Sequence, residues 1–230
     1  MNTYLAPLKA RFEAAANPDQ AEPMKKYMRN QFEFLGIKSP AQADLFKQFV
    51  AEYGLPNPDQ IEAVVKDLWG WPAREYQYVA LLILGKQQKH LTPDIVPCLE
   101  YLITTKSWWD TVDSLASHGV GKLLRQYPNH RDAVINPWRQ SDNLWLRRTT
   151  LLFQLGYKAE TDTQLLFSLV EENQDSSEFF IQKAIGWALR EYSKTAPEAV
   201  QDFVSGAALA SLSQREALKW LKAKGKLKPT

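Results

Sequence analysis

Hydrophobic residues recur along almost the whole chain at the spacing of amphipathic helices, and runs that alternate with period two are nearly absent. Such spacing predicts helices, because it places apolar side chains on one helical face. The segments that carry it, joined by short turns, are 1–20, 39–54, 57–71, 72–87, 91–106, 112–128, 130–141, 142–158, 162–173, 176–194, 197–207 and 211–224. The sequence therefore predicts an all-α fold of about a dozen helices.

Helix boundaries are also readable from single residues. In segment 39–54, Ser39 is expected to be the N-cap, Pro40 lies in the first turn and Gly54 ends the helix. No Gly/Ser-rich linker separates the segments. We therefore expect residues 1–230 to form a single domain.

The helical pattern repeats with a constant spacing. Four similar segments, 75–84, 110–119, 145–154 and 180–189, each start 35 residues after the previous one, and 213–221 is a looser copy. A period of roughly 33–47 residues with two or three helices per unit is typical of HEAT- and armadillo-like solenoids. This period predicts an α-solenoid of HEAT-like repeats; the alternative is an irregular helical bundle with a chance spacing.

The repeat register predicts which side chains share a surface. The fourth residues of the four copies are Tyr78, Asp113, Arg148 and Lys183. Equivalent positions form a ladder in a stacked array, and helical neighbours three or four residues away join the same face. Those neighbours are Trp109, Trp187 and Arg190. Aromatic and cationic groups around one carboxylate predict a concave basic groove suited to a polyanion.

Composition narrows the class of protein. The chain is 45% hydrophobic and has a net charge of +2. Its aromatic content of 12%, with eight tryptophans, is high, so we expect some aromatic rings to have roles besides packing. The single cysteine, Cys98, indicates a reducing compartment and a core position. His90, His118 and His130 form no metal-ligand spacing, and no cofactor motif is present. Without a signal-like or membrane-spanning apolar run, a cytoplasmic protein with no membrane partner is expected.

Basic residues are frequent in the C-terminal quarter. Those expected on the groove, where phosphate contacts favour nucleic-acid binding over a merely solvated helix face, are Arg148, Lys158, Lys183, Arg190, Lys194 and Lys219. The roles of Phe179 and Phe180 are left open, because each could either pack in the core or contact the nucleic acid. Trp69, Trp71, Trp108 and Trp138 are interpreted as packing residues.

Three segments identify a family. "TTKSWWDTVDS", "DNLWLRRTTLLFQLGYK" and "SSEFFIQKAIGWALREYSKT" closely resemble AlkD-type DNA alkylation repair proteins, which are bacterial DNA glycosylases built from HEAT-like repeats. "AEPMKKYMRNQFEFLGIKSP" and "LSQREALKWLK" extend the likeness over nearly the whole chain. The resemblance implies removal of positively charged alkylated purines, such as N7-methylguanine and N3-methyladenine, from duplex DNA.

The resemblance also assigns roles to residues. The catalytic aspartate of the family falls on Asp113, and its sugar-contacting tryptophans fall on Trp109 and Trp187. Its DNA-contacting arginine falls on Arg148, and the tyrosine that touches the duplex opposite the lesion falls on Tyr27. Where some members have a glutamine, this chain has Lys38, which changes one contact to the opposite strand. The family acts without enclosing the damaged base, which implies tolerance of bulky adducts.

These residue types suit that chemistry. A cationic purine leaves as a neutral base, so one carboxylate suffices to stabilise the sugar cation and orient water, without a general acid. Asp110 is expected to be the N-terminal cap or first-turn acid of its helix. Nearby Arg148 and Lys183 are expected to lower the pKa of Asp113. The structural alternative for Asp113 is a salt bridge with Arg148.

Three functions remain open from the sequence. The first is a glycosylase that acts as a monomer. It is expected to be monofunctional, without lyase activity, because no lysine lies beside Asp113 on the same helix turn. The second is a non-catalytic HEAT-repeat protein that binds distorted or damaged DNA. The third is a protein-binding scaffold, for which DNA affinity would lack a steep dependence on salt.

Overall fold

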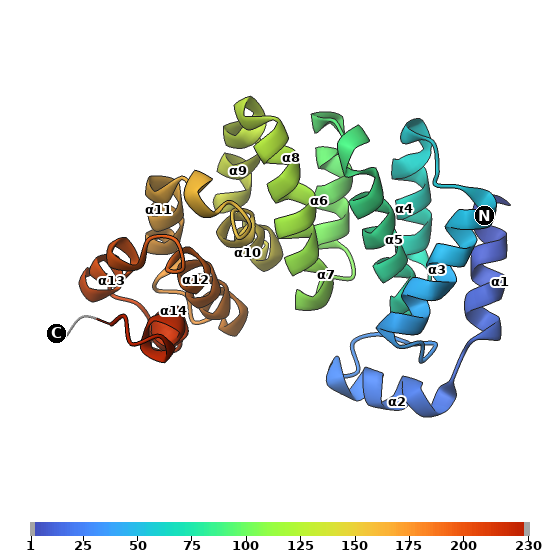
Figure 1. The fold of residues 1–230 in the computed structure, drawn as a ribbon, viewed down its shortest axis with the longest axis horizontal. Helices are drawn as coiled ribbons and strands as arrows, with labels where there is room; N and C mark the ends of the chain where they lie inside the picture. Colours follow the sequence, from blue (N-terminus) through green and yellow to red (C-terminus); the bar gives the residue numbers. More distant parts are fainter. Residues whose placement is uncertain (1–2, 228–230) are drawn as a thin grey trace. The chain divides into compact units, whose positions relative to one another are not determined.

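The computed structural model describes residues 3–227, and in this range helices and turns account for the chain apart from one isolated bridge between Glu33 and Ala73 (Figure 1). The predicted all-α class is confirmed. The chain divides into two compact units, Met1–Cys98 and Leu99–Thr230. No helix within residues 3–227 has both the length and the apolar character that crossing a membrane requires.

The first unit contains five α-helices before α6. They are α1 (Ala6–Ala14), α2 (Pro18–Tyr27), α3 (Ser39–Tyr53), α4 (Ile61–Gly70) and α5 (Arg74–Gln87). Helices α1 and α3 pack together, as do α4 and α5. The buried Glu75 carboxylate accepts backbone N–H groups from Leu35, Gly36 and Ile37 at 2.9–3.1 Å. This carboxylate fixes the segment between α2 and α3, because it pairs three otherwise unsatisfied donors.

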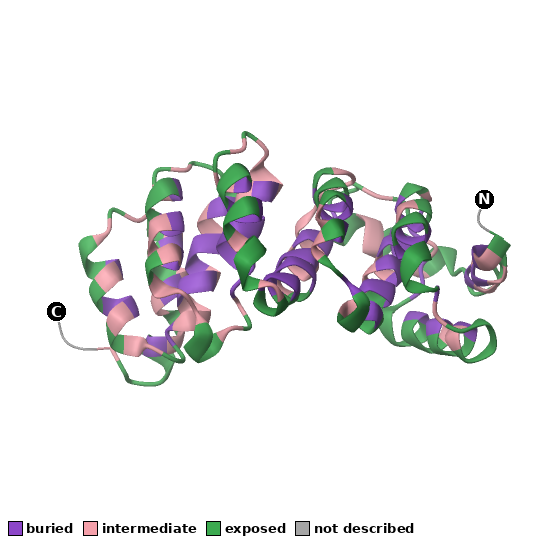
Figure 2. Ribbon diagram, turned by 90° about the horizontal axis from the view of Figure 1, so that it is seen from above, coloured by how far each residue is buried: buried purple, intermediate pink, exposed green. Residues whose placement is uncertain are grey.

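The second unit begins within α6 and contains the remaining helices. They are α6 (Val96–Thr104), α7 (Trp109–Ser114), the π-helical segment η5 (Leu115–Val120), α8 (Gly121–Gln126), α9 (Arg131–Arg139), α10 (Leu144–Leu152), α11 (Thr163–Asn173), α12 (Phe179–Tyr192), α13 (Pro197–Gly206) and α14 (Ser211–Ala223). Helix α10 packs on α12 and α12 packs on α14. Buried residues line the facing sides of these helices and exposed residues the outer sides (Figure 2).

Side-chain contacts inside the second unit follow the repeat. Arg148 contacts Asp113, and Arg125 contacts Glu160, in each case across 35 residues. Tyr157 Oη donates to the carbonyl of Gly121 across 36 residues. Contacts at one constant separation arise when equivalent positions of neighbouring repeats stack. The helices are therefore consistent with the predicted helical-repeat solenoid.

Some local predictions need correction. Ser39 is the first residue of α3, and the N-cap is Lys38, whose side chain makes no capping bond; the end at Gly54 is confirmed by its φ of 75°. Segment 112–128 is not one α-helix, because η5 interrupts it. Segment 1–20 is not one helix either, because α1 ends at Ala14 and α2, which was not predicted as a separate helix, begins at Pro18. Trp69 and Trp138 are buried, as expected for packing residues.

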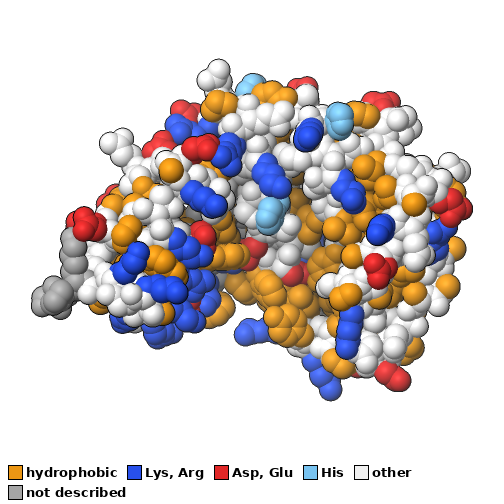
Figure 3. Space-filling model, in the orientation of Figure 1, with side chains coloured by type: hydrophobic (Ala, Val, Ile, Leu, Met, Phe, Trp, Pro, Cys, Tyr) orange, Lys and Arg blue, Asp and Glu red, His pale blue; other side chains and the backbone are white. Residues whose placement is uncertain are grey.

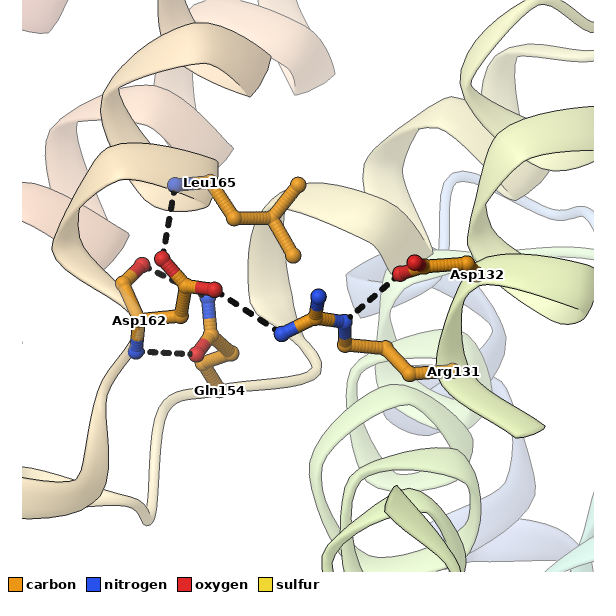
Figure 4. A network of polar contacts seen from close by, with 5 residues as sticks. All are labelled: Arg131, Asp132, Gln154, Asp162 and Leu165. Atoms are coloured by element: carbon orange, nitrogen blue, oxygen red, sulfur yellow. Dashed lines mark hydrogen bonds and ion pairs between the residues drawn. The ribbon is translucent and has the colours of Figure 1, made fainter. Parts of the chain in front are cut away.

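A polar network holds the turn between α10 and α11 (Figure 4). Asp162 caps α11 by accepting the Leu165 N–H at 3.0 Å, and it accepts from Arg131 Nη1 at 2.8 Å. Gln154 accepts the backbone N–H of Asp162 at 2.8 Å and donates to its carbonyl at 3.3 Å. Arg131 also donates to Asp132 at 2.9 Å. The two ends of the turn are thus joined to each other, to α9 and to the start of α11.

Candidate active site

One pocket of the second unit, of ≈ 260 Å³, gathers most of the predicted site residues. We call it the tryptophan pocket. Its lining consists of Trp109, Asp113, Arg148, Phe179, Phe180, Lys183, Trp187, Arg190 and Glu216. All but Glu216 were predicted from the sequence.

Asp113 and Arg148, which both line this pocket, form a bidentate ion pair. Arg148 Nε lies 2.7 Å from Asp113 Oδ1, and Nη2 lies 2.8 Å from Oδ2. The guanidinium also donates through Nη1 to the Phe180 carbonyl. The side chain of Arg148 is 4% exposed and that of Asp113 is 14% exposed. The salt bridge named as the structural alternative is therefore present, and it is largely shielded from water.

The ion pair leaves Asp113 able to accept further hydrogen bonds. A carboxylate has about four lone-pair sites, of which the two contacts to Arg148 use two. Burial raises the pKa of Asp113, while Arg148 opposes the shift and Asp110 adds to it. Arg148 acts on this pKa in the expected direction, but the expected net lowering is wrong, because desolvation outweighs the attraction of the cation.

Helix α12 supplies the opposite wall. Lys183, Trp187 and Arg190 are spaced by four and three residues, so they share one helical face. Lys183 Nζ lies 3.0 Å and Arg190 Nη1 2.6 Å from the Glu216 carboxylate. Figure 3 shows Lys and Arg side chains gathered over α12 and α14.

Glu216 reaches this wall from α14 because Gly186 allows close packing. A Cβ at Gly186 would lie 2.5 Å from Glu216 Cβ and 3.0 Å from the Ser213 carbonyl oxygen, closer than side chains tolerate. Lys183 holds the pKa of Glu216 below its usual range, helped by Arg190 and Lys219. Glu216 is thus an ionised carboxylate that anchors two cations beside Trp187.

The sequence contains a signal for Glu216. In the looser copy 213–221 the fourth residue is Glu216, equivalent to Asp113, Arg148 and Lys183. Ion pairs join these equivalent positions two by two, Asp113 with Arg148 and Lys183 with Glu216. Extending the register to the looser copy would have identified this carboxylate.

An aromatic cluster lies behind Phe180, which lines the pocket. Trp108, Trp145 and Phe180 have ring centroids 5.0–5.9 Å apart. Phe179 contacts Phe180 and is 54% exposed. Trp108 is half-buried at the N-cap of α7, and Asp110 lies in the first turn without being the cap. Phe180 therefore packs within the aromatic cluster while Phe179 projects from it.

The remaining predicted residues lie outside the tryptophan pocket. Lys158 and Lys194 line a different pocket of ≈ 210 Å³. Lys219 is exposed on α14. Tyr27, 70% exposed, and Lys38, also exposed, belong to the first unit. Within residues 3–227 no group of three or more His, Cys, Asp or Glu residues is placed to hold a metal ion.

Comparisons with other proteins identify the family of the chain. The sequence profile of the family described as DNA alkylation repair enzyme matches residues 8–221. A solved structure described as a predicted DNA alkylation repair enzyme from Enterococcus faecalis is 33% identical, with a TM-score of 0.83. The likeness covers 90% of this chain and 96% of that one. No match was found among curated protein sequences.

Proposed function

The chain belongs to the DNA alkylation repair enzyme family, and from this premise we propose that it is a monofunctional DNA glycosylase acting in base excision repair. It hydrolyses the N-glycosidic bond of cationic alkylated purines in duplex DNA: N7-methylguanine, N3-methyladenine and larger N3 or N7 adducts. It acts as a monomer and does not enclose the base. One observation carries the proposal: a shielded Asp113 lies in the same pocket as Trp109 and Trp187.

The pocket supplies stabilisation for a developing sugar cation. As the bond to the base lengthens, positive charge moves from the purine onto the deoxyribose. The Asp113 carboxylate attracts this charge, and its remaining lone pairs orient a water molecule for attack. Trp109 and Trp187 add roughly 0.5–2 kcal/mol each if their faces meet the cation. These interactions strengthen in the transition state, so they accelerate the reaction rather than only binding substrate.

A second carboxylate in the pocket does not change this scheme. Glu216 has a pKa below its usual range because Lys183 pairs with it. At neutral pH it holds no proton to donate to a leaving base. The pocket therefore suits substrates whose base is already positively charged, and it disfavours undamaged purines.

The proposal is tested by single-turnover base release from duplexes that contain N7-methylguanine. Asp113→Asn is expected to lose at least about 100-fold in rate, as when a preorganised electrostatic group is removed, while duplex binding is largely kept. Asp110→Asn, one turn earlier on α7, is the matched control and should release base at nearly the wild-type rate. Wild-type activity in Asp113→Asn would refute the role of this carboxylate.

The alternative is a non-catalytic protein that binds damaged DNA. It is favoured by the engagement of both Asp113 oxygens with Arg148, which is also what a purely structural ion pair shows. Such a binder releases no base from any of the three kinds of adduct under single-turnover conditions. The same assay therefore separates the two functions.

A further inference from the structure

A second pocket, of ≈ 530 Å³, lies in the same unit and shares Asp113 and Trp187 with the tryptophan pocket. We call it the histidine pocket, after His118. One wall comes from η5 and the start of α8, and the other from the turn that follows α10. Because two residues line both pockets, the histidine pocket begins where the proposed reaction site ends.

The walls of the histidine pocket are held in place. Gly121 packs so closely on the end of α10 that a Cβ there would lie 2.1 Å from the Phe153 carbonyl oxygen. Tyr157 Oη donates to the Gly121 carbonyl at 2.6 Å. Ser117 Oγ donates to the Asp113 carbonyl at 2.8 Å, within the π-helical turn. Single π-helical turns inside helices are frequently found at functional sites.

The charges around the histidine pocket do not cancel. Its two carboxylates already have cationic partners: Asp113 pairs with Arg148, and Glu191 pairs with Lys194 at 2.5 Å. Arg125 is paired with Glu160.

Lys122 is the cation left over. It is exposed, and within residues 3–227 its ammonium has no ion pair. Its charge reaches His118, whose pKa is lowered first by burial and further by Lys122. Lys122 lies in one pocket with the His118 imidazole and the Ser114 hydroxyl, groups that can share the oxygens of one anion, whereas Ser117 already donates its proton to the Asp113 carbonyl.

We propose that the histidine pocket binds a phosphate group of the lesion-bearing DNA strand through Lys122 and His118. This assignment rests on the proposed function, which places the nucleotide sugar against Trp187 and Asp113 and so sets the direction of the strand. A nucleotide sugar lies between two phosphates, so a sugar held against Trp187 and Asp113 places one phosphate on each side. Lys183 and Arg190 face one side, and the histidine pocket lies on the other. The pocket thereby fixes the position of the sugar along the strand.

The test uses undamaged duplex DNA and therefore needs no catalysis. Affinity is measured by fluorescence anisotropy over a range of salt concentrations for wild type, Lys122→Gln and Lys122→Arg. Loss of one phosphate contact is expected to reduce the slope of log affinity against log salt by about 0.9. Lys122→Gln should show this change with a severalfold weaker Kd, and Lys122→Arg should retain the wild-type slope. Lys89→Gln, which removes an exposed lysine of the first unit, controls for net charge.

An unchanged slope and Kd in Lys122→Gln, or a change no larger than that of Lys89→Gln, would overturn the proposal. The imidazole NMR signals of His118 identify the source of the phosphate. A shift with duplex DNA supports the assignment, whereas a shift with inorganic phosphate alone makes the pocket a site for free anions and refutes it. Absence of N7-methylguanine release by wild type would instead refute the glycosylase, so the two failures are distinguishable.

Discussion

Two carboxylates occupy equivalent repeat positions in the tryptophan pocket, yet their environments shift their pKa values in opposite directions. Burial raises the pKa of Asp113 in spite of its bidentate partner Arg148, whereas Lys183 lowers the pKa of Glu216. The partner explains the difference. Arg148 is 4% exposed, while Lys183 is 37% and Arg190 27% exposed. Water therefore solvates the ion pairs of Glu216 and screens their attraction, whereas it is largely kept away from the Asp113–Arg148 pair.

This contrast has a functional side under the proposed mechanism. A desolvated carboxylate interacts strongly with a charge that develops beside it, because little water screens the attraction. Asp113 has this character and Glu216 does not. We therefore expect chemistry at Asp113 and positioning of cations at Glu216, although the repeat register treats the two residues alike.

Removing Arg148 should have the largest effect on stability. Arg148→Gln leaves the Asp113 charge buried without its partner, and loss of one member of a buried pair costs about 3–5 kcal/mol. Denaturant unfolding measures this loss. The double variant Asp113→Asn with Arg148→Gln should be more stable than Arg148→Gln alone. A loss below about 1 kcal/mol in the single variant would show that the pair is effectively solvated.

The next effect concerns the packing that carries Glu216 into the pocket. Gly186→Ala places a methyl group 2.5 Å from Glu216 Cβ, so α12 and α14 must separate. Overpacking of this kind costs about 1–3 kcal/mol. Unfolding measurements should show that loss, and base release should fall as Lys183 and Arg190 lose their anchor. Gly85→Ala is the control, since a Cβ there meets nothing within 4 Å.

The pH dependence of stability should have opposite signs for the two carboxylates. A raised folded-state pKa makes the Asp113 contribution most favourable below its ordinary value of 3.8, and that contribution is lost as pH rises through the folded pKa. A lowered pKa makes the Glu216 contribution present above 4.5, and it is lost as pH falls through the folded pKa.

Unfolding free energies of Asp113→Asn and Glu216→Gln, each subtracted from wild type across this acidic range, measure the two trends. If the difference in unfolding free energy from wild type changed with pH in the same direction for both variants, the two pKa values would not be shifted in opposite directions.

Glu216→Gln at neutral pH should have the smallest effect on stability. Its partners are partly exposed, and ion pairs of this kind contribute about 0–1 kcal/mol. The same denaturation assay checks this value against Arg148→Gln. A loss of unfolding free energy as large as that of Arg148→Gln would show that the ion pairs of Glu216 are as shielded from water as the Asp113–Arg148 pair.

The helices and much of the site could be predicted from the sequence. The spacing of Lys183, Trp187 and Arg190 puts them on one face of α12, and the period of 35 relates Asp113 to Arg148. Both features follow from local geometry, which repeats wherever the pattern repeats. Glu216 was missed because the last copy is offset, with 33 residues between Lys183 and Glu216. The π-helical segment beside Asp113 had no signal in the hydrophobic pattern.

The sequence by itself determined the helical class, the repeat period and the family, because these depend on short-range spacing and on local motifs. Only the tertiary structure decided which carboxylate has a partner shielded from water: Asp113 and Glu216 are 14% and 15% exposed, but Arg148 is 4% exposed and Lys183 37%. The access of water to an ion pair depends on how closely neighbouring helices approach. Glycines that admit α14 to α12, and α8 to the end of α10, set those distances. Two residues that are equivalent in the repeat thereby acquire opposite pKa shifts, because desolvation acts through the surroundings and not through the sequence position.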